Sequence, residues 1–69
     1  MTPDDYLALP YHRIIEPDED GFSAKVSELS GCFSQGDTYD ECAEYLGRAM
    51  YAWFAACIQY GIEIPLPQE

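Results

Sequence analysis

The stretch that most constrains the fold is the run from Thr38 to Gly61, TYDECAEYLGRAMYAWFAACIQYG. Thr38 followed three residues later by Glu41 fits a capping box, in which a hydroxyl and a carboxylate each accept a hydrogen bond from a free backbone amide. Apolar residues then recur at steps of three and four, and Gly61 is a typical C-terminal stop. The pattern predicts one helix over residues 39–60, whose inner stripe consists of Tyr39, Cys42, Ala43, Leu46, Ala49, Met50, Trp53 and Cys57.

The length and the two halves of this helix predict a second surface. A helix of 22 residues is about 33 Å long, whereas a seven-residue strand spans about 23 Å, so the helix should extend past any sheet it covers. The first half carries acidic residues and Arg48, but the segment MYAWFAACI is apolar all round, which usually means burial all round. We therefore expect a protein–protein surface, most simply that of a homodimer, at Tyr51, Ala52, Phe54, Ala55 and Ile58.

The residues before the helix predict a small sheet. Residues 11–16 are rich in aromatic and β-branched side chains, and Pro10 indicates that this strand starts after it or lies at an edge of the sheet. The next residues, PDEDG at 17–21, form a turn by composition. The polar residues 1–6 are expected to be frayed.

A hairpin and a third strand follow this turn. Residues 22–28 alternate in hydrophobicity, with Phe22, Ala24 and Val26 on one face. Two strands joined by a short glycine-containing loop make a hairpin. A second turn then leads to a short strand at 32–35.

The end of the chain completes the predicted fold. Residues 62–64 could add a short strand before Pro65 closes it. The element order is then β-β-β-α-β, an α+β fold with one long helix packed on one face of a small antiparallel sheet. With 69 residues, the chain is expected to form a single domain, residues 1–69.

Composition restricts the possible partners. The net charge is −10, from thirteen Asp and Glu residues against three Lys and Arg residues. Such a chain repels phosphate backbones, so we expect no direct binding of DNA or RNA. It attracts a basic protein, although the charge could also serve solubility alone.

The cysteines and the termini indicate a compartment. The three cysteines show no CxxC or Cys/His metal spacing, which suggests reduced thiols in a cytoplasmic protein. The N-terminal residues lack the basic region and the apolar run of a signal peptide, and no stretch is apolar enough to span a membrane. Nothing in the sequence calls for a cofactor or a metal.

The stretch GCFSQGDTYDECAEYL, residues 31–46, holds residue types found in active sites. The single histidine, His12, would have to activate Cys32 or Ser34, which requires the first and third strands to bring them together. The consecutive acids at 18–20 fan outward and lack the calcium-loop spacing, which leaves only weak cation binding open there. Turn geometry and helix capping explain the remaining polar residues, so we expect no catalytic site.

Taken together, these segments resemble the N-terminal domain of HicB-like antitoxins. The matching pieces are an aromatic-x-x-ϕ-I-E run at 11–16, where ϕ is a hydrophobic residue, an acidic turn with Gly21, F-x-A-x-V at 22–26, L-x-G-C at 29–32, S-x-G-D-T at 34–38 and a final G-x-x-I-P-x-P at 61–67. The resemblance marks a set of turn and cap residues as fold signatures: Gly21, Gly31, Gly36, Asp37, Thr38 and Glu41.

The resemblance implies a degraded ribonuclease-H-like fold without catalysis, and neutralisation of a small basic mRNA-cleaving toxin of the HicA type by direct binding. Many relatives carry an additional DNA-binding domain, which these 69 residues cannot accommodate, so DNA binding is not expected. Two alternatives stay open. One is a stand-alone structural or regulatory homo-oligomer; the other is a residual metal-dependent nuclease that would depend on Asp18 or Asp37.

Overall fold

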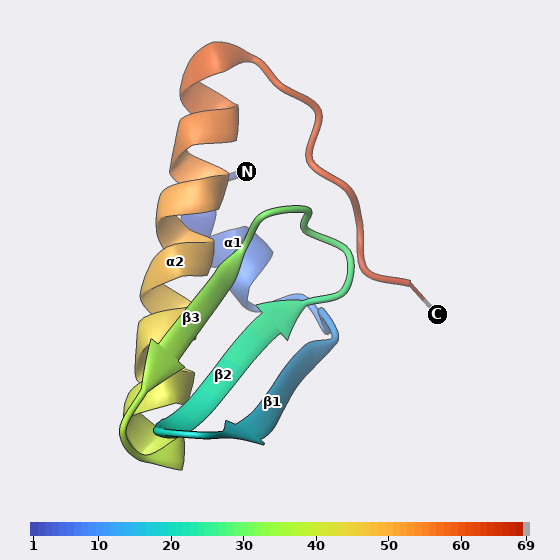
Figure 1. The fold of residues 1–69 in the computed structure, drawn as a ribbon. Coiled ribbons are helices and arrows are strands. Elements are labelled where there is room, and N and C mark those ends of the chain that lie inside the picture. Colours follow the sequence, from blue (N-terminus) through green and yellow to red (C-terminus); the bar gives the residue numbers. More distant parts are fainter. Residues whose placement is uncertain (69) are drawn as a thin grey trace.

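The computed structural model describes residues 1–68 and forms two layers (Figure 1). The elements are, in chain order, α1 (Pro3–Leu7), β1 (Arg13–Asp18), β2 (Gly21–Val26), β3 (Phe33–Gly36) and α2 (Tyr39–Tyr60). The strands make one antiparallel sheet in the order β1-β2-β3, and α2 covers one of its faces. The predicted α+β class, with three strands followed by a long helix, is confirmed.

The two faces of the sheet differ in character. The face toward α2 contributes Ala24, Val26 and Ser34, all of which are buried. The other face is open, and its central row runs from Ile14 across Lys25 to Phe33. The buried apolar cluster lies between the sheet and the helices and consists of Tyr11, Ala24, Val26, Leu29, Cys32, Cys42, Leu46, Met50 and Phe54.

Helix α2 begins and ends where the sequence predicts. The Thr38 hydroxyl accepts a hydrogen bond from the backbone N–H of Glu41 at 3.1 Å. The Glu41 carboxylate accepts in turn from the N–H of Asp37, at 3.2 Å, which is one residue earlier than in a standard capping box. Gly61 closes the helix in the left-handed conformation, with φ of 66°.

The inner stripe of α2 differs from the prediction at two positions. The buried residues of the helix are Cys42, Leu46, Met50, Phe54 and Cys57. Tyr39, expected on this stripe, is 55% exposed, and Phe54 rather than Trp53 takes the central position. The prediction that Phe54 belongs to an outer interface is therefore wrong, because its side chain is fully buried within the chain.

The N-terminal residues form helix α1, so the expectation that residues 1–6 are frayed is wrong. Thr2 caps α1 in a complete capping box: its hydroxyl accepts from the N–H of Asp5, and the Asp5 carboxylate accepts from the N–H of Thr2. The ring of Tyr6 stacks on Phe54, with centroids 5.3 Å apart. Helix α1 therefore covers Phe54 and helps to bury its ring.

The sheet has one strand fewer than the sequence predicts, and the bounds of its strands are slightly shifted. Residues 62–64 form no strand; the segment 62–68 is irregular and runs back past the β2–β3 loop (Figure 1). It is held by Ile64, which packs against the buried cluster, and by the Tyr11 hydroxyl, which donates to the carbonyl of Pro65. Strand β1 extends to Asp18, so the predicted turn at 17–21 shrinks to its two central residues. Neither described helix has the length and apolar character needed to cross a membrane.

Candidate functional site

Two acidic stretches that are far apart in the sequence meet at one end of the sheet. The register aligns Asp18 with Gly21 and Phe22 with Gly36, which places the β1–β2 turn beside the entry to α2. Both glycines permit this approach. A Cβ on Gly21, whose φ is 153°, would overlap the carbonyl oxygen of Gly36, and a Cβ on Gly36 would lie 2.6 Å from the backbone nitrogen of Cys42.

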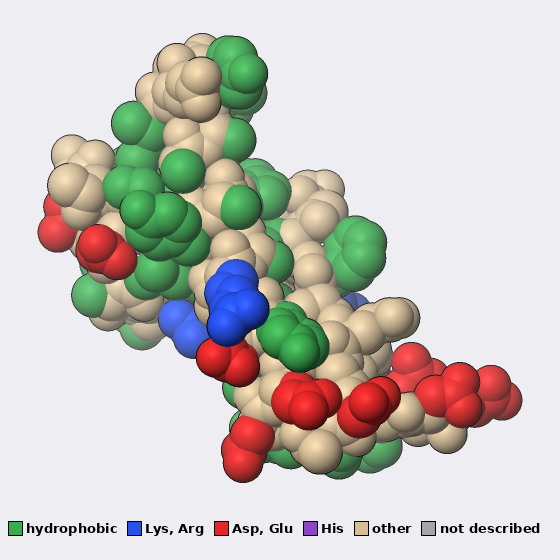
Figure 2. Space-filling model, turned by 90° about the vertical axis from the view of Figure 1, so that its left-hand side faces the viewer, with side chains coloured by type: hydrophobic (Ala, Val, Ile, Leu, Met, Phe, Trp, Pro, Cys, Tyr) green, Lys and Arg blue, Asp and Glu red, His purple; other side chains and the backbone are tan. Residues whose placement is uncertain are grey.

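We call this end of the molecule the acidic pole. Figure 2 shows acidic side chains along the lower end of the molecule, where they dominate the surface. Arg48 forms an ion pair with Glu44 at 3.2 Å, but both side chains are largely exposed, so the pair contributes little to stability. The pole holds eight of the thirteen acidic residues of the chain, and all eight are exposed: Glu16, Asp18, Glu19, Asp20, Asp37, Asp40, Glu41 and Glu44.

The charges of the acidic pole have different local explanations. Asp40 and Glu41 lie in the first turn of α2, where the helix dipole stabilises negative charge. Residues 18–20 lie at the tip of the hairpin, without such compensation from a helix. A concentrated negative field of this kind attracts and orients a positively charged partner.

The outer face of α2 changes character beyond the acidic pole. No Asp, Glu, Lys or Arg occurs from Ala49 to Ile62. Hydrophobic side chains are grouped over the upper half of the molecule in Figure 2, and two acidic side chains lie beside this group at the left. We call this surface the uncharged helix face, and it consists of Tyr51 (46% exposed), Ala52, Ala55 and Ile58 (42% exposed).

Gly31 lies apart from both surfaces. It has φ of 79° in the loop between β2 and β3, at the opposite end of β2 from the acidic pole. The structure thus brings Gly21, Gly36, Thr38 and their acidic neighbours together, while Gly31 serves a separate turn.

The candidate nucleophiles are engaged elsewhere. The Ser34 hydroxyl donates to the carbonyl of Cys42 at 2.9 Å. Cys32 is buried, and desolvation raises the pKa of its thiol, which disfavours the reactive thiolate. His12 directs Nδ1 at the carboxylate of Glu28, 2.8 Å away. Among residues 1–68, no three His, Cys, Asp or Glu side chains are arranged to hold a metal ion.

Comparison with known families decides how these surfaces are interpreted. A family model described as the HicB_like antitoxin of bacterial toxin-antitoxin systems matches residues 11–69. The chain belongs to the HicB-like antitoxin family. The matched region includes the sheet, α2 and therefore both surfaces, whereas α1 precedes it. No curated protein and no solved structure gave a significant match. The role of an antitoxin implies a toxin partner.

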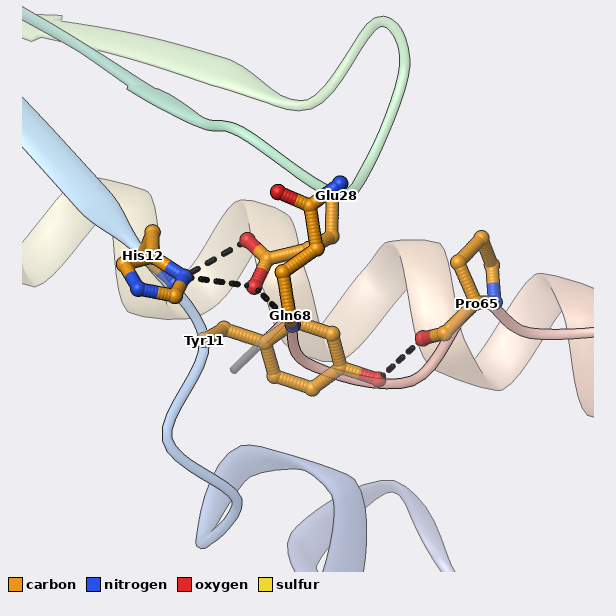
Figure 3. A network of polar contacts seen from close by, with 5 residues as sticks. All are labelled: Tyr11, His12, Glu28, Pro65 and Gln68. Atoms are coloured by element: carbon orange, nitrogen blue, oxygen red, sulfur yellow. Dashed lines mark hydrogen bonds and ion pairs between the residues drawn. The ribbon is translucent and has the colours of Figure 1, made fainter.

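The HicB-like chain also contains a polar network that sequence reasoning missed (Figure 3). The Glu28 carboxylate is only 1% exposed and accepts hydrogen bonds from the backbone N–H groups of His12, at 3.0 Å, and Gln68, at 2.9 Å. Desolvation acts to raise the pKa of Glu28. The hydrogen bonds from the His12 ring and these amides lower it by more, so the pKa falls to about 2. The sequence did contain an indication of this burial. Glu28 follows Ala24 and Val26 at steps of two residues, so it falls on the same inward-facing side of the alternating segment.

Proposed function

We propose that this HicB-like chain neutralises a small, basic, mRNA-cleaving toxin of the HicA type by direct binding, without catalysis of its own. Family membership supports the antitoxin role, and the acidic pole supports a basic partner. The sheet and α2 would then be a partial ribonuclease-H-like fold kept as a binding scaffold. Three free, buried thiols suit a reducing cytoplasm, where mRNA is located.

The acidic pole is the proposed contact with the toxin. A ribonuclease holds its RNA through Lys and Arg side chains that bind phosphates. Eight exposed carboxylates on adjacent elements offer those side chains a competing set of negative groups. Binding would thus cover the RNA-binding surface of the toxin, and long-range attraction would speed association at low ionic strength.

We also propose that the chain acts as a homodimer through the uncharged helix face. Tyr51 and Ile58 are each more than two-fifths exposed on a helix half that carries no charge. Aromatic residues are enriched and charged residues depleted in the centres of protein–protein interfaces. The uncharged helix face matches this composition, because it contains Tyr51 and no charged residue.

The test takes as the candidate toxin a small basic protein encoded beside the gene for this chain. Co-expression should suppress its toxicity, and calorimetry should show a complex whose affinity falls as salt increases. The double variant Glu19→Gln with Asp20→Asn should weaken binding about tenfold, which corresponds to about 1.4 kcal/mol. The matched control, Asp4→Asn with Glu63→Gln, removes the same charge away from the acidic pole and should change affinity far less.

Two results would contradict this proposal. If the neighbouring protein neither binds nor is toxic when expressed alone, the antitoxin function of this chain against it is wrong. If both double variants weaken binding equally, only net charge matters and the acidic pole is not the contact.

A further inference from the structure

We propose that two copies of the chain pair with their α2 helices antiparallel across the uncharged helix face, so that the acidic poles lie at opposite ends of the dimer. This inference rests on the homodimer part of the proposed function and not on toxin binding. It assigns an orientation and a centre, near Ala55, to the contact.

Charge selects a second copy as the occupant of this surface. A chain with a net charge of −10 repels its own copies, so they associate most easily where neither carries charge. The outer side of α2 between Arg48 and Glu63 is such a surface, because no charged residue lies between these two positions. A strongly basic toxin would gain no electrostatic attraction there, whereas it would gain it at the acidic pole.

Charge also selects the orientation. In a parallel pair, the two acidic poles would lie side by side at the usual helix separation of about 8–10 Å, which is comparable to the Debye length in physiological salt. In an antiparallel pair centred on Ala55, Asp40 lies about 22 Å before the centre, so the poles are about 44 Å apart along the axis. Salt screens this repulsion almost completely, and the two helix dipoles also oppose one another.

The side chains suit an isologous contact of this kind. Ala52 and Ala55 are small and allow two helices to approach, while Tyr51 and Ile58 flank them and can fill the grooves. In a two-fold antiparallel pair centred here, position 51 of one copy lies near position 58 of the other. The exposed residues Ala52 and Gln59 form a second reciprocal pair by the same seven-residue spacing.

The antiparallel arrangement predicts the stoichiometry of the complex with the toxin. Each dimer presents two acidic poles that face away from each other, so two toxin molecules can bind without contact between them. The expected assembly has two antitoxin and two toxin chains, with equal affinity at both poles.

Cysteine cross-linking tests the orientation. Ala52→Cys and Gln59→Cys are made separately, oxidised alone, and then oxidised as a mixture. The two positions are seven residues apart, or about 10 Å along the helix, which exceeds the Cα–Cα distance of about 4.4–6.8 Å that a disulfide can bridge. Antiparallel pairing predicts a cross-linked dimer mainly in the mixture. The wild type, whose three cysteines are buried, measures the background.

The other outcomes separate the two proposals. Efficient cross-linking of each variant alone would show a parallel pair and overturn this inference, leaving the homodimer in place. A monomer by sedimentation at micromolar concentration, with no cross-link in any sample, would overturn the homodimer as well. Toxin binding, measured in the same samples, stands or falls independently of both.

A charge substitution supplies a second measurement. Tyr51→Glu places a negative charge at the contact in both copies and should raise the dimer dissociation constant at least tenfold. Phe33→Glu is the matched control, because Phe33 is 67% exposed on the open face of the sheet, away from α2. Equal dimer dissociation for both variants would contradict the proposed surface.

Discussion

The two halves of α2 are buried by different means. The first half, Tyr39–Arg48, lies on the sheet: Ser34 bonds to the carbonyl of Cys42, and Phe22 meets Tyr39 edge-on with centroids 6.0 Å apart. The second half extends past the strands. It is covered by α1, by Tyr11 and by the β2–β3 loop, whose Ser30 carbonyl accepts from the Trp53 indole.

The two halves together show how a short chain buries a helix that is longer than its sheet. The buried stripe passes from Cys42 through Leu46 and Met50 to Phe54 in steps of four residues. Because a step of four advances about 40° beyond a full turn, the stripe rotates around the helix. It therefore faces the sheet at the start of α2 and faces α1 and Tyr11 at Phe54.

The largest expected effect comes from removing the centre of the second half. Phe54→Ala should cost about 3–5 kcal/mol in unfolding free energy, because its fully buried ring contacts Tyr6, Tyr11 and Trp53. A loss of this size is close to the whole stability of many small domains, so circular dichroism should show a largely unfolded chain at 25 °C.

A milder variant keeps this prediction measurable. Phe54→Leu retains most of the apolar volume and should fold, with a loss of about 1 kcal/mol in urea titration. Phe33→Ala, on the open sheet face, serves as the control and should lie within about 0.5 kcal/mol of the wild type. If Phe54→Ala is as harmless as this control, the second half of α2 is not anchored as described.

The second half is also where sequence reasoning was least successful. Local patterns predicted the bounds of α2, its Thr38 cap and the order of the three strands, because these depend on neighbouring residues. They missed α1, although Thr2 and Asp5 form a complete capping box. Without α1, nothing in the predicted fold covers Phe54. Missing this helix therefore led to the wrong placement of Phe54 on an outer surface.

The acidic pole was recognised only in parts. Local chemistry explains the acids at 18–20 as a turn and those after Thr38 as helix-start residues. Their meeting depends on the close approach of Gly21 to Gly36, a contact between distant residues that no local periodicity encodes. The uncharged helix face was found from composition, but the assignment of Phe54 to it required the position of α1.

A smaller effect is expected from the cover itself. Tyr6→Ala removes a half-buried ring that stacks on Phe54 and should cost about 1–2 kcal/mol in unfolding free energy. Urea titration with the fluorescence of Trp53, the single tryptophan, measures it. Asp4→Asn, in the same helix but exposed, is the control. Equal stability of the two variants would mean that residues 1–6 are frayed and that the contact with Tyr6 does not help to hold Phe54.

The most local effect concerns the segment 62–68, which Glu28 ties to the start of the sheet. The carboxylate has a pKa of about 2 in the folded chain, against an ordinary value of 4.5. A carboxyl with a depressed pKa stabilises the fold fully above its unfolded value and loses that contribution as pH falls from about 4.5 through about 2. The difference in stability between wild type and Glu28→Gln should shrink across this window.

Urea titrations at several pH values between 2 and 7 would measure that difference, with Glu63→Gln as the control for removing one exposed negative charge. Exchange of the Gln68 amide hydrogen, which donates to Glu28, should accelerate in Glu28→Gln, while the amides of the first half of α2 stay protected. A difference that is independent of pH would contradict a stabilising role for the Glu28 carboxylate. Faster exchange throughout α2 would show that Glu28 supports the whole fold, and the two halves of the helix would then not be separate in their anchoring.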